Sequence, residues 1–427
     1  MAANREAARD RANAVMARCN ELATASDEPG RLTRGYGTPA SRQAQLMTAT
    51  WMEAAGMTVR RDAVGNLIGR YPGDNDSGQT LLLGSHLDSV RDAGRYDGPL
   101  GVLVGLTAVE RLHARSERLP FAIDVLAFAD EEGLRYGTAY LGSTAYTGAF
   151  DRQWLTATDA QCVTLAEAVR DFDGDPDALG TERRDGGDLL GWVEVHIEQG
   201  PSLEAHDLPV GIVTAIAGRT RIDVTLTGEP GHAGTVAMPL RRDALGAAAE
   251  LVLAVESMGR EVDGLVATIG QLTVEPGAAN VIPGLARLTM DIRHSSDDVR
   301  QAACRDLAET ANRIAAARQI EIDWAIVNDN VATPCDPRLT RELASAVNEV
   351  GYATHLLPSG AGHDAVTLSA ITPVAMLFVR CAGGISHNPA ESVTEADVAV
   401  AIRVLDTLLT RLAANQKASG AENRAET

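Results

Sequence analysis

Apolar and polar positions follow two periodicities along most of the chain, one typical of helices and one typical of strands. Apolar residues recur at helical spacing over 12–22 and 44–55, and both segments are predicted to be helices. Nearly uninterrupted apolar runs lie at 80–84 and 121–129, with a predicted helix at 100–113 between them. Strands that are apolar on both faces and alternate with helices are typical of a mixed, mostly parallel sheet flanked by helices.

The pattern changes after residue 217. Residues 219–227 carry apolar side chains at every second position, which predicts a half-exposed strand. The elements predicted next complete the order βαββαβ, which is typical of a small α+β sandwich of ferredoxin-like topology. They are a helix at 241–258, strands at 265–274 and 286–293, a helix at 296–317 and a strand at 320–327.

The first pattern returns after residue 330. The predicted elements there are a helix at 338–350, strands near 352–356 and at 374–380, and a closing helix at 395–413. We therefore expect an α/β domain in two pieces, 1–217 and 330–414, with an inserted α+β domain at 218–329. The polar tail at 415–427 is predicted to be disordered.

The amino-acid composition argues against several classes of partner and of catalytic chemistry. The 427 residues include 38 Lys and Arg against 58 Asp and Glu, which gives a net charge of −20. Such a surface repels phosphate backbones and anionic lipids, so neither a nucleic acid nor a membrane is an expected partner. The sequence contains one lysine, Lys417 in the polar tail, which argues against Schiff-base, P-loop and Ser-Lys chemistry.

The cysteines and the apolar runs indicate a soluble, cytoplasmic protein. The five cysteines are scattered and form no C-x-x-C pair, as expected of buried thiols in a reducing compartment. Apolar runs stay shorter than the roughly 18 residues of a membrane span, and the N-terminus lacks the apolar core of a signal peptide.

Residue types that bind metals lie at or after the ends of four predicted buried strands, at 80–84, 121–129, 191–197 and 374–380. Open α/β sheets place their sites at the carboxyl ends of such strands. Taken singly, a histidine or carboxylate at such a position could equally lie in a turn, belong to a solvated acidic pair or be a hydrogen-bonded histidine of the core. Their recurrence favours a metal site, because burying so many ionisable groups without a cation is unfavourable. The residues are His86 with Asp97, Glu131 with Glu132, His196, and His387.

Five ligands, namely the three histidines, Asp97 and one of the two glutamates, suit two divalent ions roughly 3.5 to 4 Å apart that share a carboxylate. Asp97, in a turn between a strand end and a helix, is a candidate for the shared ligand. Asp88 could accept the second N–H of His86 and so fix the tautomer of that ring. Of the adjacent Glu131 and Glu132, one could bind a metal while the other acts as a general base.

Six strings of the sequence resemble the dinuclear-metal amidohydrolases that cleave ureido groups. This family contains allantoate amidohydrolases, N-carbamoyl-L-amino-acid hydrolases and β-ureidopropionases of one type, and it is related to aminoacylases and dinuclear-zinc carboxypeptidases. The resemblance runs from about residue 32 to residue 412 in unbroken order. The strings are GSHLDS at 84–89, YDGPLG at 96–101, DEEG at 130–133, HIEQGP at 196–201, GHAGT at 231–235 and ISHNP at 385–389.

The resemblance implies two divalent metal ions per subunit, which can be Mn²⁺, Zn²⁺ or Co²⁺. It implies that His86, Asp97 and His196 bind one ion, and that Asp97, Glu132 and His387 bind the other. Glu131 is the implied general base, acting on a hydroxide that bridges the metals. A histidine at 196 favours the ureido-cleaving branch, since the related peptidases and deacylases place a carboxylate there.

The resemblance also implies roles for the inserted domain, which corresponds to a lid and a dimerisation module. His232 matches a histidine that enters the site of the partner subunit and stabilises the oxyanion, so we expect a homodimer. The remaining implied residues bind or surround the substrate. They are Asn280 and Arg293 for its carboxylate, Gln199 in the pocket, and Gly362 and His363 in the loop SGAGHD at 359–364.

The predicted reaction is hydrolysis of allantoate to ureidoglycine, ammonia and carbon dioxide. The stretches 131–137 and 376–387 resemble allantoate-cleaving members most. An N-carbamoyl-L-amino-acid hydrolase or β-ureidopropionase using the same site is the nearest alternative. An aminoacylase or dipeptidase, and a non-catalytic binding module on the same scaffold, are the others; His196 argues against the first and the intact ligand set against the second.

Overall fold

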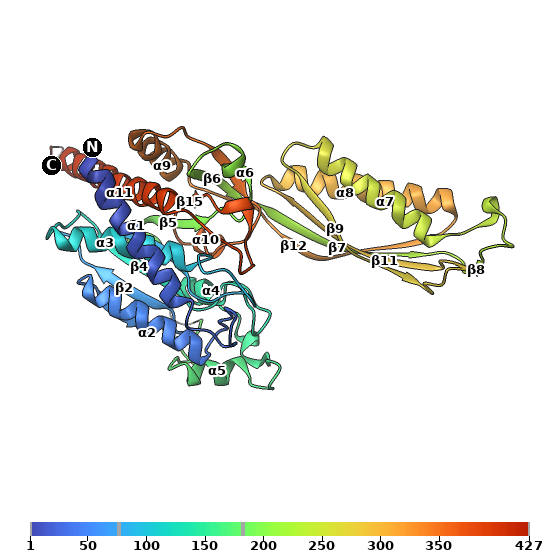
Figure 1. Cartoon of the computed structure of the whole chain (residues 1–427), viewed down its shortest axis with the longest axis horizontal. Helices are drawn as coiled ribbons and strands as arrows, with labels where there is room; N and C mark the ends of the chain where they lie inside the picture. Colours follow the sequence, from blue (N-terminus) through green and yellow to red (C-terminus); the bar gives the residue numbers. More distant parts are fainter. Residues whose placement is uncertain (1, 75–77, 181–183, 426–427) are drawn as a thin grey trace. The chain divides into compact units, whose positions relative to one another are not determined.

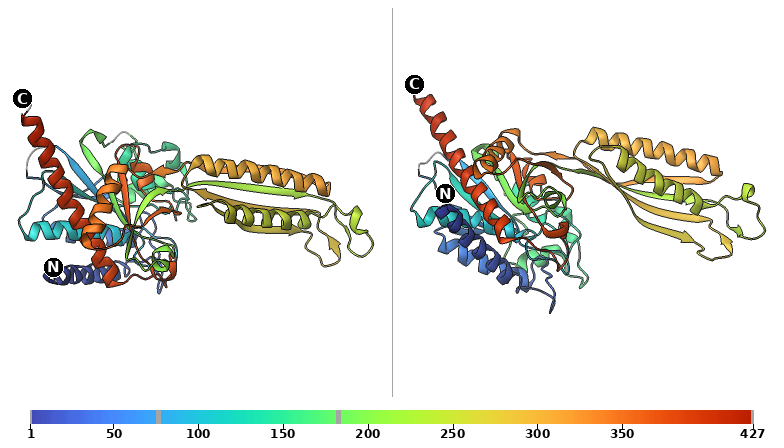
Figure 2. Two further views of the ribbon diagram at one scale, coloured as in Figure 1. Left: turned by 90° about the horizontal axis from the view of Figure 1, so that it is seen from above. Right: turned by 45° about the horizontal axis from the view of Figure 1, so that its top comes forward.

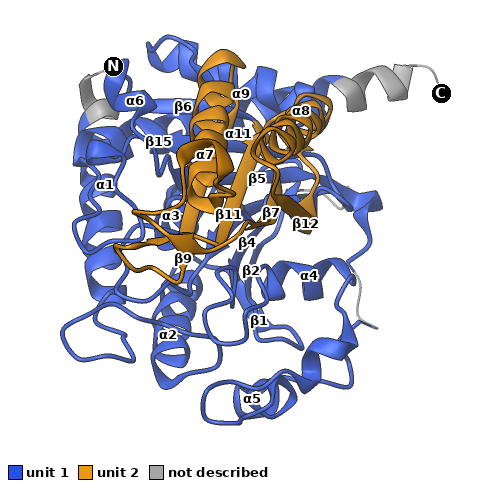
Figure 3. Cartoon of the chain, turned by 90° about the vertical axis from the view of Figure 1, so that its right-hand side faces the viewer, with its two compact units in different colours: residues 1–214, 335–357, 363–427 blue, residues 215–334, 358–362 orange. Residues whose placement is uncertain are grey.

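The computed structural model describes residues 2–74, 78–180 and 184–425. The chain divides into two compact units, which Figure 3 shows in blue and orange. Unit 1 comprises 1–214, 335–357 and 363–427, and unit 2 comprises 215–334 and 358–362. Within the described ranges, no helix combines the length and the apolar character that crossing a membrane requires.

Unit 1 is built on one large mixed sheet. Its strand order is β1-β2-β4-β3-β5-β15-β6-β13, and β14 pairs with β6. The central pairs β3/β4, β3/β5 and β5/β15 are parallel, whereas the outer pairs are antiparallel. The strands are β1 (Thr58–Arg61), β2 (Leu67–Tyr71), β3 (Thr80–His86), β4 (Ala122–Phe128), β5 (Leu189–Ile197), β6 (Val210–Ile216), β13 (Thr333–Pro334), β14 (Leu356–Ser359) and β15 (Val374–Val379).

Helices cover this sheet. The first and last helices of the chain, α1 and α11, lie side by side, and α3 packs on the central strands β3 and β5 (Figure 1). The helices of unit 1 are α1 (Ala2–Leu22), α2 (Pro39–Ala54), α3 (Pro99–Ala114), α4 (Leu141–Thr147), α5 (Leu165–Asp171), α6 (Ser202–Ala205), α9 (Pro337–Val350), α10 (Ala365–Leu368) and α11 (Glu395–Ala425).

The central strands separate a dry core from a polar face. Leu83, Val193 and Leu377 belong to the apolar cluster that includes residues of α1, α3, α9 and α11. Successive strand residues point to opposite faces, so Glu194 and His196 point away from that cluster, to the side where α10 packs on β5 and β15. The alternation thus fixes the face on which the polar side chains of these strands lie.

Unit 2 has a four-stranded antiparallel sheet of order β12-β7-β11-β9. Its helices α7 and α8 contribute apolar residues to one core with the sheet and run along it in the views of Figure 2. A separate two-stranded ribbon pairs β8 with β10. The elements are β7 (Gly218–Thr227), β8 (Gly231–His232), α7 (Ala244–Glu261), β9 (Val266–Glu275), β10 (Val281–Ile282), β11 (Leu285–His294), α8 (Asp297–Arg318) and β12 (Glu321–Asn330).

The predicted fold class is confirmed: a mixed, largely parallel sheet with helices, and a separate α+β unit with the order βαββαβ. Three details differ from the prediction. Unit 2 spans 215–334 rather than 218–329 and also includes 358–362. The strand predicted near 352–356 begins only at Leu356, because Gly351 ends α9 in the left-handed conformation and the chain needs further residues to reach β6.

The third difference concerns the predicted disordered tail. In the structure α11 continues from Glu395 to Ala425, so the polar residues from 415 onward extend the helix, and only 426–427 lie outside the described residues. The buried apolar positions of α11 end at Ala413, and residues 414–418 are exposed or half-exposed and contribute no buried side chain to the core. Alanine and other good helix formers continue the helix without that core contact.

A buried arginine joins the end of α1 to the segment that follows β3. The Arg34 side chain is 1% exposed, and its guanidinium donates to three backbone carbonyls. These are the carbonyls of Leu87 at 2.5 Å, Leu22 at 2.8 Å and Ala25 at 3.1 Å. The planar guanidinium reaches all three at once, which a single ammonium cannot do.

We therefore expect Arg34→Lys to destabilise unit 1 by about 2–4 kcal/mol, since hydrogen bonds from a charged donor to buried carbonyls are lost. The melting temperature from differential scanning calorimetry measures the effect. Arg31→Lys, a neighbouring exposed arginine, is the control and should change stability by less than about 0.5 kcal/mol. Equal melting temperatures for the two variants would show that the three carbonyl contacts do not stabilise the fold.

Candidate metal centre

The order of the central strands brings the predicted ligands to one edge of the sheet. His86 is the last residue of β3, Glu131 and Glu132 follow β4, His196 is the penultimate residue of β5, and His387 lies beyond β15. These four strands are neighbours in the order β4-β3-β5-β15 and run parallel. Their carboxyl ends therefore lie side by side.

Two groups of potential ligands form at this edge, and both include Asp97. One consists of His86, Asp97 and His196, and the other of Asp97, Glu132 and His387. In each group one donor atom per residue lies within 4.8 Å of the others. Asp97 lies in the turn directly before α3, where Gly98 adopts a positive φ against the ring of His86.

The two oxygens of Asp97 face different groups. Oδ1 lies 3.1 Å from Nε2 of His196 and 3.7 Å from Nε2 of His86. Oδ2 lies 3.1 Å from Nε2 of His387, whose Nε2 is also 3.3 Å from Oε1 of Glu132. A carboxylate placed between two sets of donors in this way is the arrangement that a shared ligand requires.

Contacts on the far side of the buried rings leave Nε2 of each ring directed toward Asp97. Nδ1 of His196 lies 2.8 Å from the carbonyl oxygen of Ile197. Nδ1 of His86 lies 3.3 Å from Oδ1 of Asp88 and 3.2 Å from the Asp88 carbonyl oxygen. An N–H held by such an acceptor fixes the tautomer in which Nε2 has a free lone pair.

Asp88 also anchors the acidic pair. Its two carboxylate oxygens accept the backbone N–H groups of Glu131 at 2.9 Å and Glu132 at 3.0 Å. The carboxylate predicted to orient His86 therefore holds the loop after β4 as well. His86, Glu131 and Glu132 form a further group of close donor atoms.

The electrostatics of the cluster favour a cation. Burial opposes ionisation of Asp97, yet hydrogen bonds from His196, His387 and His86 outweigh it and hold the pKa of Asp97 well below its ordinary value. The carboxylates of Asp97 and Glu132 raise the pKa of the His387 imidazole to about 10. Protonated rings thus supply positive charge that a metal ion would otherwise provide.

Glu131 differs from its neighbour Glu132 in its surroundings. Its carboxyl is buried, and burial raises the pKa of Glu131 well above its usual range, with Glu132, Asp364 and Asp88 adding to the shift. A carboxylate that is easily protonated beside a cluster of ligands has the property of a general base.

Gln199 and His363 lie at the same cluster. Gln199 has a positive φ of 58°, and its amide Nε2 donates to Oδ2 of Asp97 at 3.1 Å. The buried ring of His363 packs edge-on against His196, with ring centroids 4.5 Å apart. His363 therefore lies behind a predicted ligand. Burial holds the pKa of His363 well below its usual value, so the ring is neutral.

The predicted residues of unit 2 fall into two places. His232 and Asn280 are neighbours on the β8/β10 ribbon, where the N–H of Ala233 donates to the Asn280 carbonyl oxygen at 2.9 Å. Arg293, near the end of β11, donates to the Asp291 carboxylate and, at 2.7 Å, to the carbonyl oxygen of Gly360 in the segment that contains Gly362. The structure thus places Arg293 with the glycine loop and His232 with Asn280.

Sequence reasoning missed several buried polar residues around the cluster. Glu194 points to the same side of β5 as His196 and accepts hydrogen bonds from Ser85 at 2.7 Å and from Trp192 at 3.2 Å. Ser386 and Glu391, close to His387 in sequence, both contact Asp97. The two-residue spacing from His196 was a signal for Glu194, whereas the role of Glu391 depends on a contact with a distant part of the chain.

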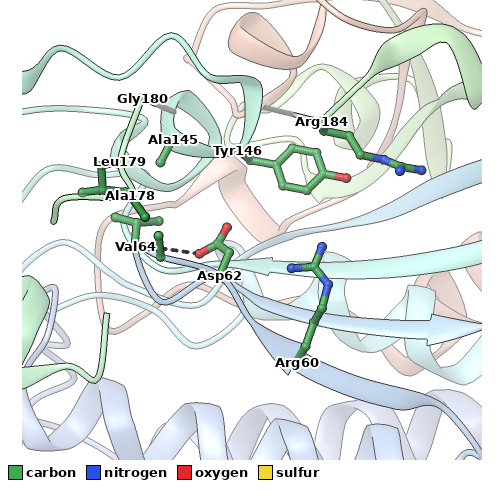
Figure 4. Close-up of a pocket in the computed structure, with 10 residues that line it drawn as sticks. Arg60, Asp62, Val64, Ala145, Tyr146, Ala178, Leu179, Gly180 and Arg184 are labelled. Carbon is green, nitrogen blue, oxygen red and sulfur yellow. Dashed lines mark hydrogen bonds between the residues drawn. The ribbon is translucent and has the colours of Figure 1, made fainter. Parts of the chain in front are cut away.

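A pocket in unit 1, shown in Figure 4, is lined by none of the predicted site residues. It is about 160 Å³ in volume, and Arg60, Asp62, Tyr146 and Arg184 are among its lining residues. The Asp62 carboxylate is already occupied by hydrogen bonds from the backbone of Val64 and from Asn66, and Arg184 pairs with Asp188. The groups suited to binding a metal lie in the Asp97 cluster instead.

The chain matches known proteins over most of its length. It matches the family described as Peptidase family M20/M25/M40 over residues 82–411. It is 40% identical over 414 residues to a probable allantoate deiminase of Oryza sativa subsp. japonica, which covers 89% of this chain and 84% of that protein. It is also 40% identical over 389 residues to an N-carbamoyl-L-amino acid amidohydrolase of Geobacillus stearothermophilus, covering 91% of this chain and 95% of that protein.

A solved structure shares the whole architecture. An amidase of the hydantoinase/carbamoylase family from Burkholderia multivorans has a TM-score of 0.88 and 32% sequence identity, covering 94% of this chain and 97% of that one. Mixed histidine and carboxylate donors such as those around Asp97 suit divalent cations. The chain therefore belongs to the M20 peptidase family, in the group of allantoate deiminases and N-carbamoyl-L-amino acid amidohydrolases, and is a metal-dependent hydrolase of linear C–N bonds.

Proposed function

We propose that this chain hydrolyses the ureido group of allantoate to ureidoglycine, ammonia and carbon dioxide, with two divalent metal ions in the Asp97 cluster. The observation that carries the proposal is the position of Asp97, whose two oxygens face separate sets of donors beside the buried Glu131. The resemblance of 131–137 and 376–387 to allantoate-cleaving members supports the choice of substrate.

The residues divide into two ligand sets that share one carboxylate. His86, Asp97 and His196 would hold one ion, and Asp97, Glu132 and His387 the other. Mn²⁺, Zn²⁺ and Co²⁺ all suit such a set. When bound, the ions polarise the ureido carbonyl and lower the pKa of a coordinated water.

Glu131 performs the proton transfers in this proposal. Its carboxylate accepts a proton from the attacking water and delivers it to the nitrogen that leaves. The high pKa that burial gives this carboxyl favours its holding the proton between the two steps. Asp88 fixes the backbone of Glu131 through the 2.9 Å hydrogen bond and so keeps the base beside His86.

His232 is the proposed donor to the oxyanion. Its Nδ1 accepts the N–H of Gly234 at 3.0 Å, so in the neutral ring the proton resides on Nε2. Nε2–H can then donate to an oxygen that gains negative charge. Asn280 beside it, and Arg293, would bind the substrate carboxylate.

We propose that the active protein is a homodimer assembled through unit 2. Strand β11, 285–294, separates Arg293 from the ribbon with His232 and Asn280, and at about 3.4 Å per residue it spans roughly 30 Å. One copy of unit 2 therefore does not place all three around one small substrate. Exposed apolar residues on α7 and the edge strand β9, Leu253, Val266 and Leu272, support a contact there.

An N-carbamoyl-L-amino acid is the second candidate substrate, because a relative of that activity is as similar to this chain as the allantoate deiminase is. Both reactions use the same ligands and base. They differ at the carbon that bears the ureido nitrogen and the carboxylate, which carries a second ureido group in allantoate and an amino-acid side chain in an N-carbamoyl amino acid.

Ammonium release by chelator-treated protein reloaded with Mn²⁺ or Zn²⁺ tests the proposal on allantoate, N-carbamoyl-L-amino acids and N-carbamoyl-β-alanine. We expect the highest kcat/KM on allantoate, and Glu131→Gln should lower kcat by about 10²- to 10⁴-fold with unchanged metal content. Glu53→Gln, at an exposed position of α2, is the control and should leave kcat unchanged. Turnover of a carbamoyl amino acid alone would move the assignment to the second substrate, and no turnover of any ureido acid would refute it.

The affinity of the site for a metal ion should rise with pH. The pKa of His387 is raised to about 10 by Asp97 and Glu132, so this ring is protonated at pH 7 and must lose its proton to bind a metal. We expect affinity for Mn²⁺ to rise with pH between 6 and 9, by up to about tenfold per pH unit for each proton displaced. Calorimetric titration in two buffers of different ionisation enthalpy counts the protons; a count of zero would contradict this.

Complementation tests the proposed exchange of His232 between subunits. Glu131→Gln and His232→Ala should each be nearly inactive alone. After mixing and reassembly, about half of the dimers would carry both variants and one intact site, giving roughly a quarter of the wild-type activity. Activity that stays at the level of the separate variants, although light scattering shows mixed dimers, would place His232 in the site of its own subunit.

A further inference from the structure

The hydroxyl of Ser386 lies between two carboxylates of the cluster. Its Oγ is 3.2 Å from Oδ2 of Asp97 and 3.1 Å from Oε2 of Glu391. A hydroxyl has one proton, so Ser386 can donate to only one of them at a time. The direction of this single hydrogen bond decides which carboxylate oxygen keeps a free lone pair.

Glu391 is held firmly against the backbone before Asp97. Its side chain is buried, and Oε1 accepts the N–H groups of Tyr96 at 2.8 Å and Asp97 at 3.2 Å. A Cβ on Gly94 would lie 2.3 Å from the same oxygen, so the close approach requires glycine there. Oε1 is thereby fixed as an acceptor of backbone N–H groups, and Oε2 faces Ser386.

Besides His387, whose Nε2 lies 3.1 Å away and would lose its proton on binding a metal, Oδ2 of Asp97 has one further donor. Nε2 of Gln199 donates to it at 3.1 Å and lies 3.3 Å from Oγ of Ser386. A carboxylate oxygen has two lone pairs in the plane of the carboxylate. If Ser386 also donated to Oδ2, hydrogen bonds would occupy both lone pairs of this oxygen, which is the one that faces His387.

We propose that Glu391 is a positioning residue that accepts the Ser386 proton and so leaves Oδ2 of Asp97 free to bind a cation in the group with Glu132 and His387. This inference rests on the proposed function, since it takes that group to be a metal site. Oδ1, which faces His86 and His196, is not within reach of Ser386. The effect is therefore specific to one of the two ligand sets.

Glu391→Gln tests the direction of the hydrogen bond with almost no change in shape. The two backbone N–H groups require the glutamine oxygen in the position of Oε1, so its amide nitrogen faces Ser386 and donates to it. The serine proton is then directed to Oδ2 of Asp97. We expect one of the two Mn²⁺-binding steps to weaken about 10- to 100-fold while the other is unchanged.

The second variant, Ser386→Ala, removes the proton in question. Placed in the Glu391→Gln background, it should restore the weakened step to within about threefold of wild type, and alone it should change neither step by more than that. A purely structural role of the two side chains predicts the opposite, with losses that add in the double variant. Ser386→Ala alone also keeps the inference testable if Glu391→Gln does not fold.

Isothermal titration of metal-free full-length protein with Mn²⁺, together with metal analysis after dialysis, measures both steps without relying on activity. Glu110→Gln on α3 is the control for a change of carboxylate to amide, since Glu110 accepts hydrogen bonds from Arg18 and from the Thr107 hydroxyl, which can also accept one from the new amide. It should leave both steps unchanged.

The outcomes separate this inference from the proposed function. Wild-type protein that binds fewer than two ions would refute the dinuclear site, and the inference with it. If wild-type protein binds two ions, three results would overturn the role of Glu391 only. These are the absence of a selective loss of affinity in Glu391→Gln, an additive loss in the double variant, and a tenfold loss in Ser386→Ala alone.

Discussion

A buried carboxylate surrounded by imidazoles is the interaction on which the rest of this structure depends. Asp97 has three histidine rings within 3.1–3.7 Å of its oxygens, and ionised Asp97 is tolerated in the interior only because they compensate its charge. Each ring must present Nε2 to the same carboxylate, so each needs its own strand end. The parallel order β4-β3-β5-β15 meets this demand, because it brings four strand ends to one edge of the sheet.

The strict alternation of strand side chains lets one sheet serve both stability and chemistry. Val193 and Val195 of β5 pack into the main apolar cluster, while Glu194 and His196 face the opposite side. A shift of register by one residue would exchange the two faces and bury the wrong set. The extensive core around α1, α3 and α11 therefore also fixes the orientation of the candidate metal ligands. This rigid scaffold explains how a site of so many ionisable groups is held together.

The fold and the gathering of the candidate ligands at one place could be predicted because their signals are local. Each apolar run that ends in a histidine or carboxylate is visible within a few residues, and the change to a half-exposed pattern after 217 marks the inserted unit. The order βαββαβ of that unit and the mixed sheet are both found. The structure also brings His86, Asp97, Glu132, His196 and His387 together, as their positions after the strands led us to expect.

What could not be predicted depends on distant partners or on weak local preferences. Glu391 has no signal of its own, because it matters only through backbone groups nearly 300 residues earlier in the chain. The contact of the His363 ring with His196 could not be predicted either, because it joins the loop after β14 to the end of β5. The end of α11 and the start of β14 differ from the prediction because the polar sequence after 414 and the largely exposed residues 352–356 carry no apolar periodicity that would specify the boundary.

The distance in sequence between Asp97 and its partners has a consequence for biosynthesis. His387, Ser386 and Glu391 leave the ribosome after the whole of unit 2 has been made, and β15 must enter between β5 and β6 to bring them to Asp97. Until then the sheet lacks a central strand and exposes the flanks of its neighbours, a state prone to pair with other chains. A nascent chain of this protein can therefore complete its Asp97 cluster only after Glu391 has been synthesised, and the insertion of β15 is the step at which folding and assembly of the site coincide.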